Sequence, residues 1–180
     1  MRNIWQLFEG ALSDEDCDKI IELGKAQKQE DASIFRNVSG NADDVRKSKV
    51  SWIIDPWLND YQNYFFKVAN ANAFGFAADL LPDAQFTTYN EGDHYTWHYD
   101  VNWEADRGYD RKLSIVIQLS DPKDYEGGIF EFEETLPKLE NFQTRGSVLV
   151  FPSYLKHRVT KITKGERKSL VNWLEGPRWR

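Results

Sequence analysis

The spacing of apolar residues predicts two kinds of structure along this chain. In the first half, apolar residues recur every three to four positions in two segments, as they do along one face of a helix. This spacing predicts helices over 13–27 and 56–73, with Ser13 capping the first and Pro56 opening the second. From Gln85 onward, apolar and polar residues alternate instead, which is typical of strands that bury one face.

Short strands separated by turns are predicted throughout the second half. Glycine, proline, asparagine and aspartate mark the turns. Strands of this length and spacing favour a sandwich or barrel over alternating βαβ units. The predicted strands are 85–89, 94–101, 113–119, 128–132, 147–151, 158–162 and 168–174, with one earlier strand at 50–54. The polar segment 27–47 is predicted to be a long loop, and the apolar cluster in 3–12 a short strand or packed arm.

Length and composition indicate one soluble domain. The 180 residues are enough for a single hydrophobic core, and the sequence has no internal repeat or linker. We therefore interpret 1–180 as one domain, in which a helical and loop layer over 1–83 supports a β-rich core over 84–175. No run approaches about 18 consecutive apolar residues, so no membrane span is expected.

The net charge and the cysteine content limit which binding partners and which cellular compartment we expect. The net charge of -6 gives no broad attraction for a phosphate backbone, which disfavours nucleic acid as a partner. Cys17 is the only cysteine, so neither an intramolecular disulfide nor a cysteine-based zinc site can form. The chain turns acidic before any apolar run could act as a secretory signal. We expect a cytoplasmic protein.

A candidate metal site centres on His98 and Asp100. The two residues are two positions apart in a predicted strand, so their side chains point to the same face and can converge on one ion. His157, in another β-rich segment, is the best candidate for a third ligand. Two histidines and one carboxylate, with other positions open, suit a non-haem Fe(II) oxygenase.

His94 competes for a place in this site. On a regular strand His94 would share a face with His98, but the turn residues before Tyr95 predict that the strand begins only there. We therefore favour His94 as a non-ligand. A zinc hydrolase is a weaker interpretation, because Tyr95 stands where the H-E-x-x-H motif needs its glutamate.

An arginine near the predicted last strand is a candidate anion ligand. Strand alternation sends one of Arg167 and Lys168 toward the interior and the other away from it. Arg167 follows His157 by ten residues across a tight turn, which favours it as the neighbour of the metal. Its planar guanidinium matches the two oxygens of a carboxylate. The alternative is that both residues are ordinary surface charges.

These residues together carry a family resemblance. The run Tyr89-x-x-Gly92-x-x-Tyr95-x-x-His98-x-Asp100, followed by His157 and by Arg167-x-Ser169, resembles the 2-oxoglutarate/Fe(II)-dependent dioxygenases. More narrowly, it is similar to their prolyl 4-hydroxylase-like branch. The resemblance covers about 84–175 and extends to the N-terminal layer only in outline.

The resemblance implies a fold and a set of site residues. The fold would be a mainly β double-stranded β-helix (jelly roll, cupin-like) with supporting N-terminal helices. Iron would be bound by His98, Asp100 and His157. Arg167 would bind the distal carboxylate of 2-oxoglutarate, helped by Tyr89 and Ser169. Some relatives place a further cosubstrate-binding tyrosine where this chain offers Ile115 or Ile117.

The resemblance also implies an activity. The protein would be a hydroxylase that couples decarboxylation of 2-oxoglutarate to succinate with hydroxylation of a protein or peptide, with peptidyl proline as the first choice. Its cofactors would be Fe(II), 2-oxoglutarate and O2, with ascorbate as reductant. Alternatives are oxidation of a nucleobase or free amino acid at the same site, or a non-catalytic cupin-like binding module. The segments 28–47 and 103–111 are candidates for a lid over the substrate, or ordinary exposed loops.

Overall fold

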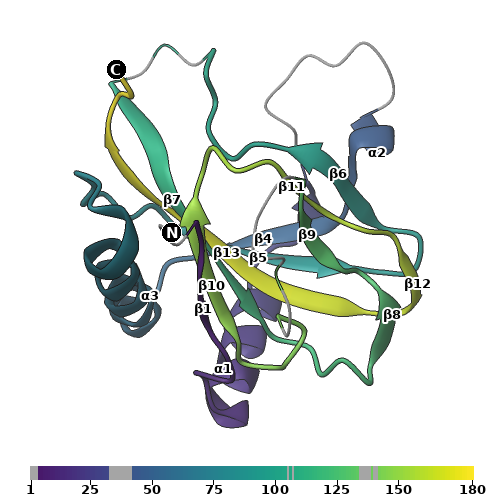
Figure 1. Ribbon diagram of the computed structural model, residues 1–180. Helices are drawn as coiled ribbons and strands as arrows, with labels where there is room; N and C mark the ends of the chain where they lie inside the picture. The colour runs from purple at the N-terminus through teal and green to yellow at the C-terminus, as the bar shows by residue number, and fades with distance from the viewer. Residues whose placement is uncertain (1–3, 33–41, 105, 107, 134–138, 140–141) are drawn as a thin grey trace.

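Two antiparallel sheets face each other, and helices cover the outer face of the larger one (Figure 1). The computed structural model describes residues 4–32, 42–104, 106, 108–133, 139 and 142–180. The arrangement is the mainly β jelly roll with supporting helices that the sequence predicted.

The larger sheet is built around the long pairing of its two central strands, which runs from Ser169 opposite Gln118 to Pro177 opposite Tyr109. The N-terminal β1 extends one edge and strands from the first half extend the other. In spatial order its described strands are β1 (Gln6–Phe8), β10 (Val148–Pro152), β7 (Tyr109–Gln118), β13 (Arg167–Pro177), β5 (Ala84–Tyr89), β4 (Lys49–Ile53) and β2 (Glu30–Asp31).

The smaller sheet holds the two histidines of the predicted metal site. In spatial order its described strands are β3 (Arg46–Lys47), β6 (His94–His98), β11 (His157–Val159) and β9 (Phe130–Phe132). A separate antiparallel pair is formed by β12 (Ile162–Gly165) and β8 (Tyr125–Gly127). Gly165 takes a φ of 74° at the turn into β13, a conformation that favours glycine.

The helices are α1 (Asp14–Lys25), α2 (Ala42–Val45), α3 (Pro56–Ala69) and a π-helical turn η1 (Asn70–Phe74) that continues α3. Ser13 caps α1 as predicted, since its side chain accepts a hydrogen bond from the backbone N–H of Asp16. Asp55 caps α3 by accepting from the backbone N–H of Leu58. None of the described helices is long and apolar enough to cross a membrane.

The larger sheet separates two clusters of buried side chains. On β7, Leu113, Ile115 and Ile117 pack in the cluster formed with the helices. Val116, between them in the sequence, packs in the second cluster, which fills the space between the two sheets. Because neighbouring side chains on a strand point to opposite faces, one strand supplies both clusters. The second cluster surrounds the site described below.

The structure differs from the prediction most clearly in three segments. The predicted loop 27–47 contains β2, α2 and β3, while 33–41 lie outside the described residues. The predicted strand 158–162 is interrupted, and the structure has β11 and β12 in its place. These short elements pair with distant partners, so their own sequence carries little signal for them. The predicted strand 94–101 ends at His98, which matters for the site.

Candidate active site

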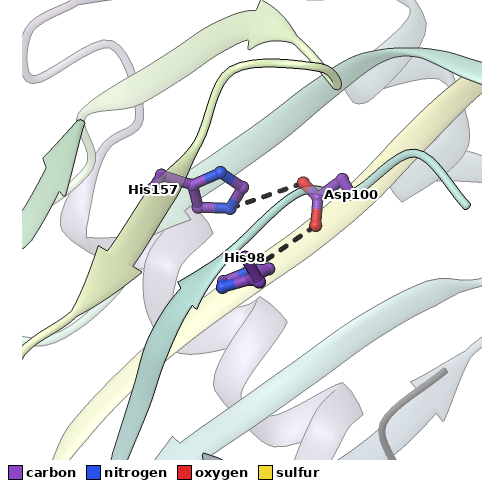
Figure 2. Close-up of side chains that lie close together, drawn as sticks. All are labelled: His98, Asp100 and His157. Atoms are coloured by element: carbon purple, nitrogen blue, oxygen red, sulfur yellow. Dashed lines mark ion pairs between the residues drawn. The ribbon is translucent and has the colours of Figure 1, made fainter. Parts of the chain in front are cut away.

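The three candidate metal ligands lie together, His98 and His157 in the smaller sheet and Asp100 just after the end of β6 (Figure 2). His98 ends β6, His157 begins β11, and the two residues are direct partners across the strands. His98 Nε2 lies 3.7 Å from Asp100 Oδ1, and His157 Nε2 lies 3.6 Å from Asp100 Oδ2. These gaps are too wide for hydrogen bonds. The three residues would instead hold a metal ion, because each offers one ligand atom and these atoms lie within 4.8 Å of one another.

The orientation of each imidazole is set by its own strand. His98 Nδ1 lies 2.8 Å from the carbonyl oxygen of Thr96, and His157 Nδ1 lies 2.9 Å from that of Leu155. A carbonyl oxygen only accepts, so each Nδ1 carries a proton and each Nε2 faces the carboxylate of Asp100. Burial, and then the neighbouring His157, lowers the pKa of His98 to about 3. His98 is therefore neutral at pH 7, which is the form that binds metals.

Asp100 is held as an ionised carboxylate at the edge of the centre. Burial by itself would raise its pKa, but His157, His98 and Arg111 together with a hydrogen bond from Ser114 outweigh burial and lower the pKa. Ser114 Oγ donates to Asp100 Oδ2 at 2.6 Å. The residues present thus fit a divalent ion, because they offer two imidazole nitrogens and one oriented carboxylate.

The reason for the convergence of His98 and Asp100 differs from the predicted one. The strand ends at His98, so strand alternation does not place Asp100. Instead the chain turns, and the backbone N–H groups of Asp100 and Val101 both donate to the carbonyl oxygen of Ser153, at 3.0 and 3.2 Å. Residues after β10 therefore position the carboxylate, a contact that the local sequence does not reveal.

His94 points away from the metal ligands because β6 is irregular. The strand starts at His94, as the predicted range 94–101 has it, and not at Tyr95, where the preceding turn residues placed its start. Opposite β11, His98 faces His157 but Tyr95 faces Val159, so β6 carries one extra residue between them. This bulge brings Tyr95 and His98 to one face, where their rings stack with centroids 3.4 Å apart. His94 Nε2 instead lies 3.2 Å from the carbonyl oxygen of Asp44.

Arg167 lies in the space between the sheets. It begins β13 opposite Tyr89 of β5, only 2 % of its surface is exposed, and its guanidinium carbon lies 5.7 Å from the Tyr89 ring centroid. A side chain at Gly128, whose φ is +58°, would meet Arg167 Cδ at 3.0 Å, so this glycine leaves room for the arginine. Lys168 points elsewhere and pairs with Glu166.

A cavity of about 210 Å³ joins these groups. Its walls include all six residues selected from the sequence: His98, Asp100, His157, Arg167, Tyr89 and Ser169. Arg167 and Ser169 are 2 % and 1 % exposed, so this part of the cavity is closed off from bulk solvent. Among the described residues, no carboxylate forms an ion pair with Arg167. A buried guanidinium facing a cavity suits an anionic ligand.

Sequence reasoning missed two further arginines in the cavity wall. Arg46 comes from β3, inside the segment predicted to be a loop, and Arg111 lies near the start of β7. Arg111 packs over the Trp173 ring at 3.5 Å and lies 3.9 Å from Glu175. Both arginines stand in runs of charged residues, which resemble solvated surface in the sequence. The only signal for either was its place before a predicted strand.

Two other expectations are changed by the structure. Ile115 and Ile117 pack toward the helices and do not line the cavity, so neither can replace a cosubstrate-binding tyrosine. Of the described residues in the candidate lid 103–111, Arg111 alone lines the cavity, and Trp103 is half-exposed. In 28–47, Arg46 is the described residue that reaches the cavity, from a paired strand.

Comparison with known proteins finds similar sequences. A family model for the 2OG-Fe(II) oxygenase superfamily matches residues 84–175, just over half of the 180 residues. The PKHD-type hydroxylase YbiX of Escherichia coli (strain 55989 / EAEC) is 32% identical over 120 residues, which are 63% of this chain and 53% of that protein. The chain spans about half the length, or less, of the curated relatives it matches.

Solved structures share the fold at low sequence identity. The viral collagen prolyl hydroxylase vCPH from Paramecium bursaria Chlorella virus-1, in its 2OG complex, has a TM-score of 0.74 at 18% identity and covers 97% of both chains. A prolyl hydroxylase from Trichoplax adhaerens, in complex with a hypoxia inducible factor peptide fragment, has a TM-score of 0.75 at 16% identity, over 96% of this chain and 83% of that one.

Proposed function

Because the chain belongs to the 2OG-Fe(II) oxygenase superfamily, we propose that it hydroxylates a proline residue within a peptide or protein. The hydroxylation is coupled to decarboxylation of 2-oxoglutarate to succinate. Fe(II), 2-oxoglutarate and O2 are the cofactors, and ascorbate serves as reductant. The observation that carries the proposal is the convergence of two histidines and one carboxylate beside a buried arginine that has no acidic partner among the described residues.

The chain's own residues divide the work of binding. His98, Asp100 and His157 would hold Fe(II) from one side and leave its other positions open to ligands. The bound metal supplies the redox chemistry with O2 and the cosubstrate. Arg167 would hold the distal carboxylate of 2-oxoglutarate through its planar fork, with Tyr89 and Ser169 as the adjacent wall.

The apolar walls keep water from the reacting groups. Val116 and Phe130 line the cavity and are 4 % and 7 % exposed. A dry site strengthens the attraction between Arg167 and a carboxylate and protects reactive species from side reactions. The substrate would enter where Trp52 and Tyr99, each 41% exposed, border the cavity. A peptide suits such a mouth, because aromatic rings pack well on proline.

The choice of a peptide substrate also rests on two structural neighbours. One is a collagen prolyl hydroxylase, and the other is a prolyl hydroxylase in complex with a peptide fragment. At 18% and 16% identity these neighbours support the fold, so the substrate itself is our proposal.

Mass spectrometry tests this function. The purified chain is incubated with Fe(II), ascorbate, 2-oxoglutarate and a panel of proline-containing peptides, and both succinate and a peptide mass gain of one oxygen are measured. We expect both products, and neither with Asp100→Ala or with the same peptides carrying alanine for proline. Succinate formed with no oxygen added to any proline peptide would contradict the proline assignment. Binding of metal and 2-oxoglutarate without succinate would indicate a non-catalytic module.

A further inference from the structure

A second buried guanidinium, that of Arg46, faces the cavity from the smaller sheet. Arg46 is 8 % exposed and lies opposite Tyr95 in the pairing of β3 with β6. Its guanidinium carbon lies 4.6 Å from the centroid of the Tyr95 ring. The His98 ring stacks on Tyr95 with centroids 3.4 Å apart, so Arg46 packs over the other face of the tyrosine. Arg46 is thus separated from a candidate metal ligand by one aromatic ring.

Arg46 makes one side-chain hydrogen bond within the part of the chain that the structure describes. Nε donates to Ser48 Oγ at 3.1 Å. Among the described residues, no carboxylate lies within ion-pair distance of the guanidinium and no acceptor contacts its two terminal nitrogens. A buried charge is costly unless it is paired and hydrogen-bonded. The contact with the Tyr95 ring and the hydrogen bond to Ser48 orient the guanidinium group but do not neutralise its charge.

The charge of Arg46 would also remain once the cofactors are bound. Fe(II) with two positive charges and Arg167 with one would balance 2-oxoglutarate with two negative charges and Asp100 with one. Arg111 has Glu175 at 3.9 Å as a counter-charge. Among the described residues and the cofactors, no anion is then left to balance the positive charge of Arg46 in the cavity wall. A substrate that brings a carboxylate would complete the balance.

We propose that Arg46 determines substrate specificity by binding a carboxylate of the substrate. The proposal deepens the proposed function and rests on it: the substrate is an acidic one, whose carboxylate lies close to the carbon that is hydroxylated. The carboxylate belongs to an aspartate or glutamate beside the target proline, or it is the α-carboxylate of the proline itself. Trp52 and Tyr99, at the mouth of the same cavity, would contact the apolar part of the substrate.

Matched acid and amide ligands test this inference without turnover. Binding to the Fe(II)- and 2-oxoglutarate-loaded protein is measured without O2 for four pairs: Glu-Pro and Gln-Pro peptides, Pro-Glu and Pro-Gln peptides, a peptide ending in proline and its amide, and free proline and prolinamide. We expect the acid to bind about tenfold more tightly than its amide in at least one pair. The pair that shows the preference identifies the source of the carboxylate.

Two substitutions on β3 assign the preference to Arg46. In Arg46→Gln the acid preference should fall to about onefold, and Arg46→Lys should retain part of it. Lys47→Gln is the matched control: it removes one positive charge from the next residue, whose side chain pairs with Asp93 at 3.7 Å outside the cavity, and should leave the preference unchanged. Affinity for 2-oxoglutarate should change by less than about twofold in Arg46→Gln.

The proposal is overturned if the wild-type protein prefers no acid in any pair, a comparison that does not depend on a variant folding. It is also overturned if Arg46→Gln keeps the preference. Failure of the proposed function is a separate result, because acid preference is measured by binding and hydroxylation by mass. A protein that prefers an acid but adds no oxygen to proline would retain the inference about Arg46 and lose the proline assignment.

Discussion

The two faces of the larger sheet serve different purposes, and β7 shows the difference within one strand. Toward the helices it presents Leu113, Ile115 and Ile117, all fully buried in an apolar cluster. Toward the smaller sheet it presents Ser114, which binds Asp100, and Val116, which lines the cavity. The first face contributes stability through burial of apolar surface, and the second places polar groups around a site. Substitutions on the two faces should therefore be separable by experiment.

The largest expected effect is the loss of activity when Asp100, at the centre of the candidate site, is replaced. Asp100→Ala removes the charged group from the candidate ligand set, so iron-dependent decarboxylation of 2-oxoglutarate should fall to background. The fold should survive, because the backbone N–H of residue 100 still donates to Ser153. Succinate release and circular dichroism measure the two properties. Full activity in this variant would remove Asp100 from the ligand set.

A substitution on the face of β7 that packs against the helices should lower stability and leave metal binding intact. Ile115→Ala leaves a cavity in the cluster beneath the helices and should lower the free energy of unfolding by about 2–5 kcal/mol. The folded protein should still bind Fe(II) with an affinity close to that of the wild type. Urea unfolding and metal titration at low temperature measure these quantities. A strong loss of metal affinity in folded Ile115→Ala would show that the two faces are coupled.

Neighbouring residues on β13 sharpen the comparison. Arg167→Ala should weaken 2-oxoglutarate binding about a hundredfold, since a buried guanidinium is lost opposite a carboxylate. Lys168→Ala removes a partly exposed charge that pairs with Glu166 and should change the affinity less than twofold, as expected of about 0–1 kcal/mol for such pairs. Titration of the metal-loaded protein with 2-oxoglutarate compares them. The reverse ranking would mean that Lys168 is the anion ligand.

A smaller effect than that of Arg167→Ala is expected behind the candidate metal ligands. Ser114→Ala deletes the hydrogen bond to Asp100 Oδ2 while leaving the three candidate ligands in place. Loss of such a supporting contact should lower Fe(II) affinity about tenfold. Competition with a chelator of known affinity measures the change, and Ser114→Thr, which keeps the hydroxyl, serves as control. Equal affinities in the alanine variant and the wild type would show that Ser153 alone positions the carboxylate.

The sequence predicted the chemistry of the site better than the path of the chain around it. His98, Asp100, His157 and Arg167 were selected by residue type, spacing and family resemblance, and the structure brings them to one cavity. The bulge in β6 could not be predicted, because it depends on how His157 and Val159 pair with that strand.

The residues that line the cavity wall were equally difficult to predict from the sequence. Arg46 reaches the cavity only because β3 pairs with β6, so that Arg46 lies opposite Tyr95. Nothing in its charged neighbourhood distinguishes it from a surface residue. The turn that brings Asp100 to the centre likewise depends on the Ser153 carbonyl, which lies 53 positions later in the chain. Long-range pairing, and not local propensity, determines these positions.

The direct pairing of His98 with His157 has a thermodynamic consequence. The unfolded chain retains only the short His98-Tyr99-Asp100 segment, because His157 joins it when β6 and β11 come together. An ion that needs all three groups thus binds the native state in preference to the denatured one, and mass action raises the melting temperature with each increase in its concentration.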